Sequence, residues 1–229
     1  MSVQFYKIPS EEKIYIYNLD DKQDIVNLAI EATNELQVTH PERTESNVKS
    51  KYMSPWNSHL LNPKLMPLCN HVEEIIMQMS NLVYGTDIKS LNVEFKVTDC
   101  WYAKYEHMDF TQRHSHYPAD WSAVVYTYVD DNASTIIFAD KYAIQPTKNM
   151  LVIFPGHLVH EVPKTPGKRD VIAMNIFKKA TFIQSLPLSL PLSLPLSLPL
   201  SLPLSLPLPE PLTLAESLML SEPLETKTD

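Results

Sequence analysis

The tetrapeptide Ser-Leu-Pro-Leu occurs six times in succession between residues 185 and 208. A proline at every fourth position removes backbone donors and prevents a continuous helix. The same prolines exclude a central β-strand. We therefore expect an extended, polyproline-like segment without internal hydrogen bonds. The globular domain is predicted to comprise residues 1–184, and residues 185–229 are predicted to be a low-complexity repeat followed by an acidic tail.

The repeat is uncharged and half leucine, so hydropathy alone would suggest a membrane span. A spanning segment must satisfy its backbone polar groups internally, and the prolines prevent this, so we predict no membrane span. The repeat is either a linker without chemistry or a tether that binds a partner. The residues after Pro209 are acidic, and we expect disorder or a weakly held helix there.

Length and charge limit the classes of function. The chain has 229 residues, enough for one sizeable domain with its own core. Its net charge of −8 makes a nucleic-acid partner less expected. Two cysteines, Cys69 and Cys100, cannot form a disulfide framework or complete a zinc site. The first residues lack the pattern of a signal peptide, so we expect a reducing, intracellular (cytoplasmic) setting.

The first half of the domain has helical periodicity. Apolar spacing predicts helices over 24–37 and 67–84, the second of which ends before Gly85. The polar, proline-containing stretch 39–63 is predicted to be a long loop with little regular structure, from which Trp56 packs on the core.

The second half alternates as strands do. Strands are expected over 91–97, 101–106, 121–129, 135–138, 150–154 and 171–177. Helices followed by many short strands are typical of an α+β fold whose sheet closes as a sandwich or barrel.

Three histidines in this strand region are candidate metal ligands. Residues two apart in a strand face the same side, so His114 and His116 can point at one metal ion. His160 would have to come from a different strand. Imidazole suits iron, zinc, copper and nickel, so ligand type alone does not choose the metal.

Several motifs in this region resemble the double-stranded β-helix core, a jelly-roll barrel, of 2-oxoglutarate- and Fe(II)-dependent oxygenases. The resemblance is strongest to the small phage-type members of the family, and it covers about residues 91–177. The matching motifs, in order, are Tyr105 nine positions before His114, the strand Ser122-Ala-Val-Val-Tyr126, the apolar strand ending Phe154-Pro155, the distal His160, and Arg169 before a strand ending Asn175-Ile176.

The resemblance implies a specific activity. Fe(II) would be held by His114, His116 and His160, and 2-oxoglutarate would be the co-substrate. Its distal carboxylate would bind the planar fork of Arg169, and Tyr126 would add a hydroxyl donor. The expected reaction is hydroxylation of a C–H bond with release of succinate and CO2. The substrate, a small molecule or a protein side chain, and the oligomeric state are not specified by these motifs.

The sequence departs from the family pattern at several positions. His116 stands where the family usually has a carboxylate ligand, which makes a three-histidine site possible. Met108 stands where a glycine is common. Asn149 replaces a turn glycine, which is tolerable because asparagine adopts positive φ more easily than most residues.

Other residues compete for the ligand positions. The pair His107 and Asp109 also spells HxD but lies too early for the family spacing, and His157 competes with His160.

Two other classes of protein remain open. The stretch from His114 to Asp120 resembles the HxHxxxE pattern of cupins, in which Asp120 would be a fourth ligand and Arg169 would have no role. A non-catalytic binding module is the second alternative, because a fold alone does not confer activity.

Overall fold

The computed structural model describes residues 4–7, 12–164 and 166–180. All the elements described below belong to one compact unit, Met1–Gln184. The conformations predicted for the repeat and the acidic tail lie outside the described residues, and our division of the chain into a domain and a tail stays a prediction.

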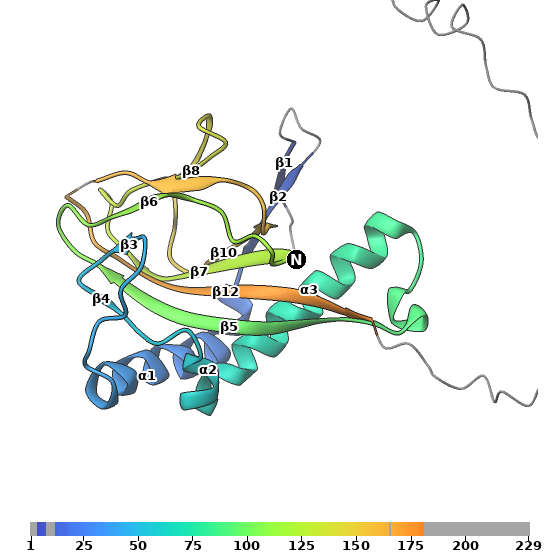
Figure 1. Cartoon of the computed structure of the whole chain (residues 1–229), viewed down its shortest axis with the longest axis horizontal. Coiled ribbons are helices and arrows are strands. Elements are labelled where there is room, and N and C mark those ends of the chain that lie inside the picture. The colour runs from blue at the N-terminus through green and yellow to red at the C-terminus, as the bar shows by residue number, and fades with distance from the viewer. Residues whose placement is uncertain (1–3, 8–11, 165, 181–229) are drawn as a thin grey trace, which may run out of the picture. The chain divides into compact units, whose positions relative to one another are not determined.

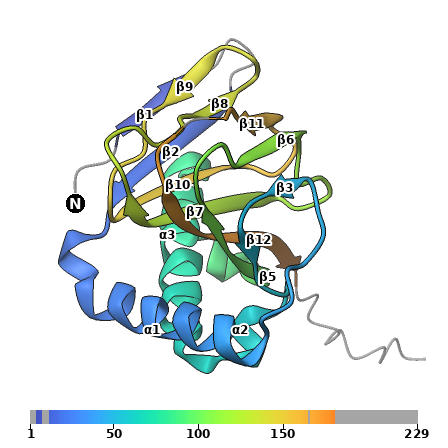
Figure 2. The ribbon, with the colours of Figure 1, turned by 90° about the vertical axis from the view of Figure 1, so that its left-hand side faces the viewer.

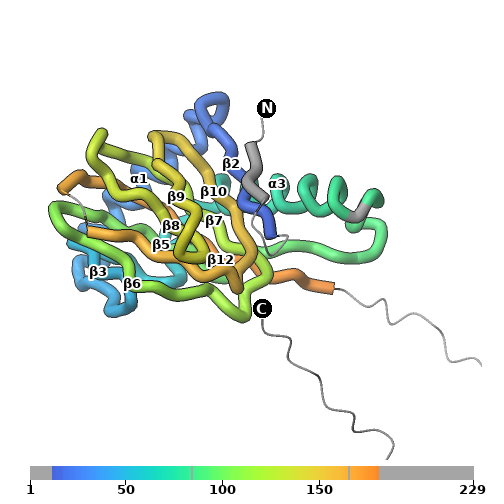
Figure 3. Tube along the Cα trace, turned by 90° about the horizontal axis from the view of Figure 1, so that it is seen from above, coloured from blue at the N-terminus to red at the C-terminus, as the bar shows by residue number. Residues whose placement is uncertain are grey.

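Two antiparallel sheets face each other and form a double-stranded β-helix, which confirms the predicted fold class (Figures 1 and 3). The larger sheet has the order β1 (Gln4–Lys7), β2 (Lys13–Asn18), β10 (Met150–Pro155), β7 (Trp121–Val129), β12 (Arg169–Ala180), β5 (Val93–Tyr105) and β4 (Tyr52–Met53). The smaller sheet has the order β3 (Val48–Lys49), β6 (Phe110–His114), β11 (His160–Val162), β8 (Ile136–Phe138) and β9 (Tyr142–Ile144).

Helices cover the outer face of the larger sheet, as Figure 2 shows. They are α1 (Gln23–Thr39), α2 (Ser58–Leu61) and α3 (Met66–Tyr84), with 3-10 turns η1 (Asp20–Lys22), η2 (Pro63–Leu65) and η3 (Ile88–Leu91). None of the helices among the described residues is long and apolar enough to cross a lipid bilayer.

Strand alternation divides the core into two layers. Val125 and Ile172 belong to the cluster between the larger sheet and the helices. Their chain neighbours Tyr126 and Val171 belong to the cluster between the two sheets. The inner face of the larger sheet therefore presents every second residue of β5, β7 and β12 to the smaller sheet.

The predicted helices agree with α1 and α3 to within two residues, and Gly85 has the left-handed φ of 65° expected just after a helix. The strand predicted over 121–129 is confirmed as β7. The strands predicted over 91–97 and 101–106 are instead one continuous strand, β5.

The loop predicted over 39–63 is more regular than expected, because it contains β3, β4 and α2. Trp56 in this loop is 39% exposed. It packs edge-on against Trp101, with 4.6 Å between the ring centres.

Candidate metal centre and its two cavities

The structure brings the three candidate histidines together. His114 ends β6, His160 begins β11, and the two residues are direct partners in the antiparallel pair. His116 lies two residues past His114, in the loop that follows β6 rather than in a strand. Its Nε2 is 3.1 Å from Nε2 of His114. One ring nitrogen from each histidine lies within 4.8 Å of the others, and this is the one such His/Cys/Asp/Glu group that the described residues form.

The hydrogen bonds at Nδ1 define which ring nitrogens are free to bind a metal. Nδ1 of His114 lies 2.8 Å from the carbonyl oxygen of Gln112, and Nδ1 of His160 lies 3.0 Å from that of Leu158. A carbonyl oxygen only accepts hydrogen bonds, so each Nδ1 carries the proton and each Nε2 keeps its lone pair. Neutral imidazoles that converge with free nitrogens suit a first-row divalent metal ion.

His116 uses a side-chain acceptor instead. Its Nδ1 lies 2.5 Å from Oδ1 of Asn175, a residue of β12 far along the chain. Oδ1 also only accepts, so His116 has the same tautomer as the other two histidines.

Burial keeps these imidazoles neutral. Removal from water lowers the pKa of His116 to about 4 and lowers the pKa of His114. Burial, followed by repulsion from the other two histidines, holds the pKa of His160 well below its usual value. The three rings are therefore neutral at neutral pH, with one nitrogen of each ring free, which is the form that binds metal.

A close backbone approach positions the loop that carries His116. The carbonyl oxygen of Gly156 accepts from the backbone N–H of His116 at 2.7 Å, and the N–H of Gly156 donates to the carbonyl oxygen of Asp120 at 3.1 Å. A Cβ atom on residue 156 would lie 2.1 Å from the carbonyl oxygen of Ala119. Only glycine permits this contact, which ties the loop to the end of β10.

An inner cavity of about 40 Å³ extends from the histidines between the two sheets. Arg169, Val171 and Ala173 line it because they alternate along the inner face of β12. Tyr105 of β5 and Tyr126 of β7 line the same cavity, and both rings lie near the guanidinium of Arg169.

Arg169 is only 3% exposed. Its guanidinium lies 4.4 Å from the ring centre of Tyr105, and its Nη1 donates to the carbonyl oxygen of Ser134 at 3.0 Å. Its Nε is buried without a hydrogen bond, and no carboxylate of the described residues pairs with it. A buried charge without an anionic partner is costly, so this position favours an anion from outside the chain. A carboxylate matches the fork geometry of the guanidinium.

Tyr126 is almost fully buried, and its ring centre lies 6.0 Å from the guanidinium carbon of Arg169. Burial raises the pKa of Tyr126 to about 12, although the charge of Arg169 acts in the opposite direction. The hydroxyl is therefore protonated at neutral pH and able to donate a hydrogen bond into the inner cavity.

A second, outer cavity of about 260 Å³ borders two of the candidate histidines. It shares Val48, Trp101, His114 and His116 with the inner cavity. Trp101 stacks on His116 at 5.7 Å between ring centres. The remaining wall is aromatic and polar, and it includes Trp56, Tyr117, Phe177, Asn175 and Asp99.

The rival ligands have other roles. His107 is exposed, and Asp109 accepts from the backbone N–H groups of Lys51 and Glu106. His157 lies at the surface, 2.8 Å from a carboxylate oxygen of Glu12.

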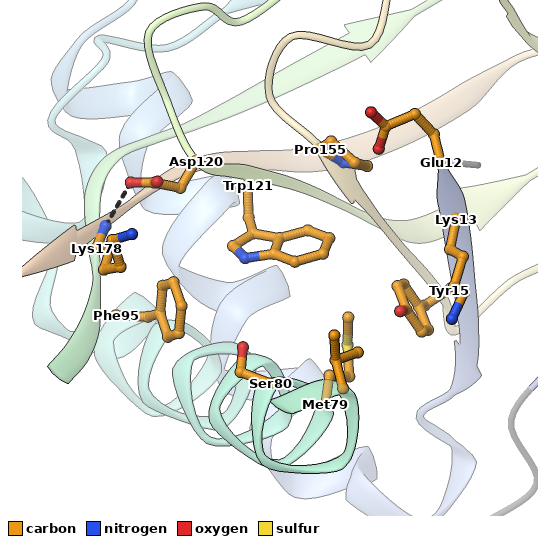
Figure 4. A pocket seen from close by; sticks show the side chains of 11 residues that line it. Glu12, Lys13, Tyr15, Met79, Ser80, Phe95, Asp120, Trp121, Pro155 and Lys178 are labelled. Carbon is orange, nitrogen blue, oxygen red and sulfur yellow. Dashed lines mark hydrogen bonds between the residues drawn. The ribbon is translucent and has the colours of Figure 1, made fainter. Parts of the chain in front are cut away.

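Asp120, the fourth ligand of the cupin alternative, lies outside the histidine group. Its carboxylate accepts from the backbone N–H of Lys178 at 2.7 Å. It borders a separate pocket beside α3, as Figure 4 shows.

The backbone conformation accounts for the expectation of glycine at two positions. Met108 and Asn149 have φ values of 65° and 62°, which is the left-handed region where glycine is favoured. Asp99 and Asn175 had no role predicted from the sequence. The even spacing between Arg169 and Asn175 could have indicated a role for Asn175, because it places Asn175 on the same face of the strand as Arg169.

Comparison with known proteins supports the fold. No family model and no curated protein sequence matches the chain. Among solved structures, the chain is similar to the non-heme α-ketoglutarate-dependent epimerase SnoN from nogalamycin biosynthesis, with a TM-score of 0.50 and 13% identity over 73% of this chain and 77% of SnoN. The chain shares the fold of this α-ketoglutarate-dependent enzyme.

Two prolyl hydroxylases are also similar. One, from Trichoplax adhaerens, was solved with a peptide of hypoxia inducible factor, and it matches with a TM-score of 0.49 and 15% identity over 72% of this chain and 83% of its own. A prolyl-4-hydroxylase from Pseudomonas putida matches with a TM-score of 0.46 and 16% identity over 79% and 92%. At these identities the likeness concerns the fold, and the function rests on the residues of the site.

Proposed function

We propose that the protein is an Fe(II)- and 2-oxoglutarate-dependent oxygenase that hydroxylates a C–H bond and releases succinate and CO2. One observation carries the proposal. The buried guanidinium of Arg169, which no carboxylate of the described residues neutralises, lines the same cavity as three convergent imidazole nitrogens. A metal site of the cupin type requires the histidines but gives the buried arginine no role.

Each part of the site has a physical task. His114, His116 and His160 would hold iron on one face and leave its other positions open. Iron and 2-oxoglutarate supply the oxidising chemistry when bound. Arg169 would bind the distal carboxylate through two parallel hydrogen bonds, and the hydroxyl of Tyr126 would donate a third.

The small volume of the inner cavity limits how 2-oxoglutarate could bind there. Its volume of about 40 Å³ holds only a few water-sized molecules. A five-carbon diacid that reaches from Arg169 to the histidines would therefore lie in close contact with the wall. That wall includes the apolar side chains of Ile136, Val162 and Val171, which would exclude water from the reacting groups.

The substrate would enter through the outer cavity, because this cavity also reaches His114 and His116. Its aromatic wall admits a small molecule or a protein side chain. We further propose a reducing, intracellular setting, which is supported by the two buried, unpaired cysteines Cys69 and Cys100.

Anaerobic addition of Fe(II) and then 2-oxoglutarate tests the proposal. The expected result is a weak visible charge-transfer band of the chelate, which saturates with one equivalent of 2-oxoglutarate. Release of succinate should follow when oxygen and a substrate are admitted. Metal binding without the band would favour the cupin-type alternative, and absence of metal binding would favour a non-catalytic module.

A further inference from the structure

The three candidate ligands are oriented in two different ways. His114 and His160 each donate from Nδ1 to the backbone carbonyl oxygen two residues earlier in the chain. His116 donates instead to the side chain of Asn175. The orientation of His116 therefore depends on one amide group from the larger sheet, whereas the other two orientations depend on local backbone.

Asn175 is itself held by a carboxylate. Its Nδ2 donates to Oδ2 of Asp99 at 3.0 Å. The two residues are direct cross-strand partners of β12 and β5, beside an irregularity in the register of the two strands. Direct partners in an antiparallel pair have their side chains on the same face, so this contact follows from the register.

The chemistry of these groups leaves one arrangement. A carboxylate only accepts hydrogen bonds, so the amide must turn its NH2 group toward Asp99. Its oxygen then faces His116, which must donate from Nδ1. The lone pair of His116 is thereby placed on Nε2, the nitrogen that lies 3.1 Å from Nε2 of His114. The orientation of the carboxylate, amide and imidazole is set without any contribution from a metal.

We propose that Asn175 and Asp99 are positioning residues that orient His116 as the third metal ligand. Three neutral imidazoles leave the positive charge of a bound metal ion uncompensated. Asp99 would supply a negative charge that reaches the metal ligand His116 indirectly, through the amide of Asn175. Hydrogen-bonded partners of this kind fix ring orientation and raise the basicity of the ligand. The inference deepens the proposed function, because it rests on the same histidines binding a metal.

Cobalt(II) titration of the full chain, without 2-oxoglutarate or oxygen, tests the proposal. In Asn175→Leu the affinity for Co(II) should fall about 10- to 100-fold. Asp99→Asn retains a side chain of the same size but removes the charge and the fixed direction of the amide, so a smaller loss is expected. Thr98→Ala is the matched control, because Thr98 precedes Asp99 in β5 and its hydroxyl contacts the backbone oxygen of Asn175 rather than the amide.

Proton NMR of the Co(II) form gives a readout that general destabilisation would not produce. The wild-type protein should show three hyperfine-shifted imidazole N–H signals in H2O that disappear in D2O. Asn175→Leu should lose one of them to rapid exchange and keep the two that belong to His114 and His160. If Asn175→Leu does not fold, Asp99→Asn still decides, because exchange of the same single signal should accelerate.

The outcomes separate this inference from the proposed function. Three slowly exchanging signals and unchanged Co(II) affinity in both Asn175→Leu and Asp99→Asn would overturn the positioning role and leave the oxygenase proposal intact. Failure of the wild-type protein to bind Co(II) through its histidines would overturn both.

Discussion

The inner face of β12 carries a polar side chain at each end of the stretch 169–175, and the hydrogen-bonding groups of only one of these side chains are fully paired within the chain. Asn175 makes its contacts within the chain, to His116 on one side and Asp99 on the other. Arg169 has a buried Nε without a partner and no carboxylate among the described residues to neutralise it. A polar side chain whose hydrogen bonds are all made within the chain needs no ligand. A buried charge without an anionic partner is instead stabilised when a ligand of opposite charge binds.

One position of β12 therefore orients a side chain of the candidate metal centre, and another offers a charge to a bound anion. At the Asn175 end, a hydrogen bond holds the ring of the candidate ligand His116 without any metal ion. The Arg169 end stores the cost of a buried charge, which a bound anion would relieve. Two inner-face residues, Val171 and Ala173, separate Arg169 from Asn175, so strand geometry fixes the distance between the candidate metal site and the proposed anion site.

Substitution of His160 is expected to have the largest effect, because it removes the metal on which both ends depend. In His160→Ala the affinity for Fe(II) or Co(II) should fall by more than the roughly 10- to 100-fold typical of an outer partner, and turnover should be abolished. His157→Ala is the control, since His157 lies at the surface beside Glu12. Full activity of His160→Ala in a succinate-release assay would end the assignment of this ligand.

Substitution of Arg169 should impair the proposed anion site and leave the candidate metal centre intact. Arg169→Ala is expected to weaken 2-oxoglutarate binding by about 2–5 kcal/mol, the usual cost of truncating one partner of a buried charge pair. Metal affinity should survive, and the unliganded protein should lose little stability because the guanidinium has no anionic partner there. Titration of the anaerobic charge-transfer band measures the change.

Arg113→Ala provides the matched control for this prediction. Arg113 is exposed and already pairs with Asp140 through two nitrogens. Its removal should leave the titration with 2-oxoglutarate unchanged. An unaltered titration in Arg169→Ala would instead remove Arg169 from the co-substrate site.

The sequence predicted the parts of the fold in which local pattern and tertiary structure agree. Helix α3 has strong apolar periodicity and a glycine after its end, and β7 alternates over its whole length. The strands β6, β9 and β11 were not predicted, because none of them shows a clear apolar alternation over its three to five residues. Their pairing in the smaller sheet depends on contacts with distant strands.

The same limit applies to the candidate site. The spacing of His114 and His116 indicated that they share a side, but His116 lies in a loop rather than a strand. The hydrogen bonds of Gly156 position that loop, and they depend on a backbone approach that no sequence period encodes. The link from His116 to Asp99 was equally hidden, because it depends on the register of two strands that are far apart in the chain.

Acid should destabilise the folded protein through the buried histidines of the site. The pKa of His116 is lowered to about 4 by burial, whereas an unfolded histidine has a pKa of about 6.5. The unfolded state then binds more protons between these values, so stability is fully present above pH 6.5 and decreases as the pH falls toward 4. For the metal-free protein we expect a loss on the order of 1–2 kcal/mol between pH 7 and pH 5 from this residue.

Urea unfolding of the metal-free protein at several pH values measures this loss. His116→Gln cannot titrate, so its stability should fall less steeply over the same range. Carboxylates contribute equally to both proteins, and the difference between the two slopes isolates the histidine. Parallel slopes would show that His116 titrates normally and that its burial does not hold it neutral.

The smallest expected effect comes from removing a single hydroxyl, that of Tyr126 beside Arg169. Tyr126→Phe deletes a protonated donor beside Arg169 and retains the buried ring. Loss of one hydrogen bond to a bound carboxylate should weaken 2-oxoglutarate binding by about 0.5–1.5 kcal/mol, with no change in metal affinity. Tyr128→Phe, two residues along the same strand, is the control, because its exposed hydroxyl bonds to Asp130. Equal effects of the two substitutions on the co-substrate titration would mean that the hydroxyl of Tyr126 does not reach the ligand and that Arg169 holds the carboxylate without it.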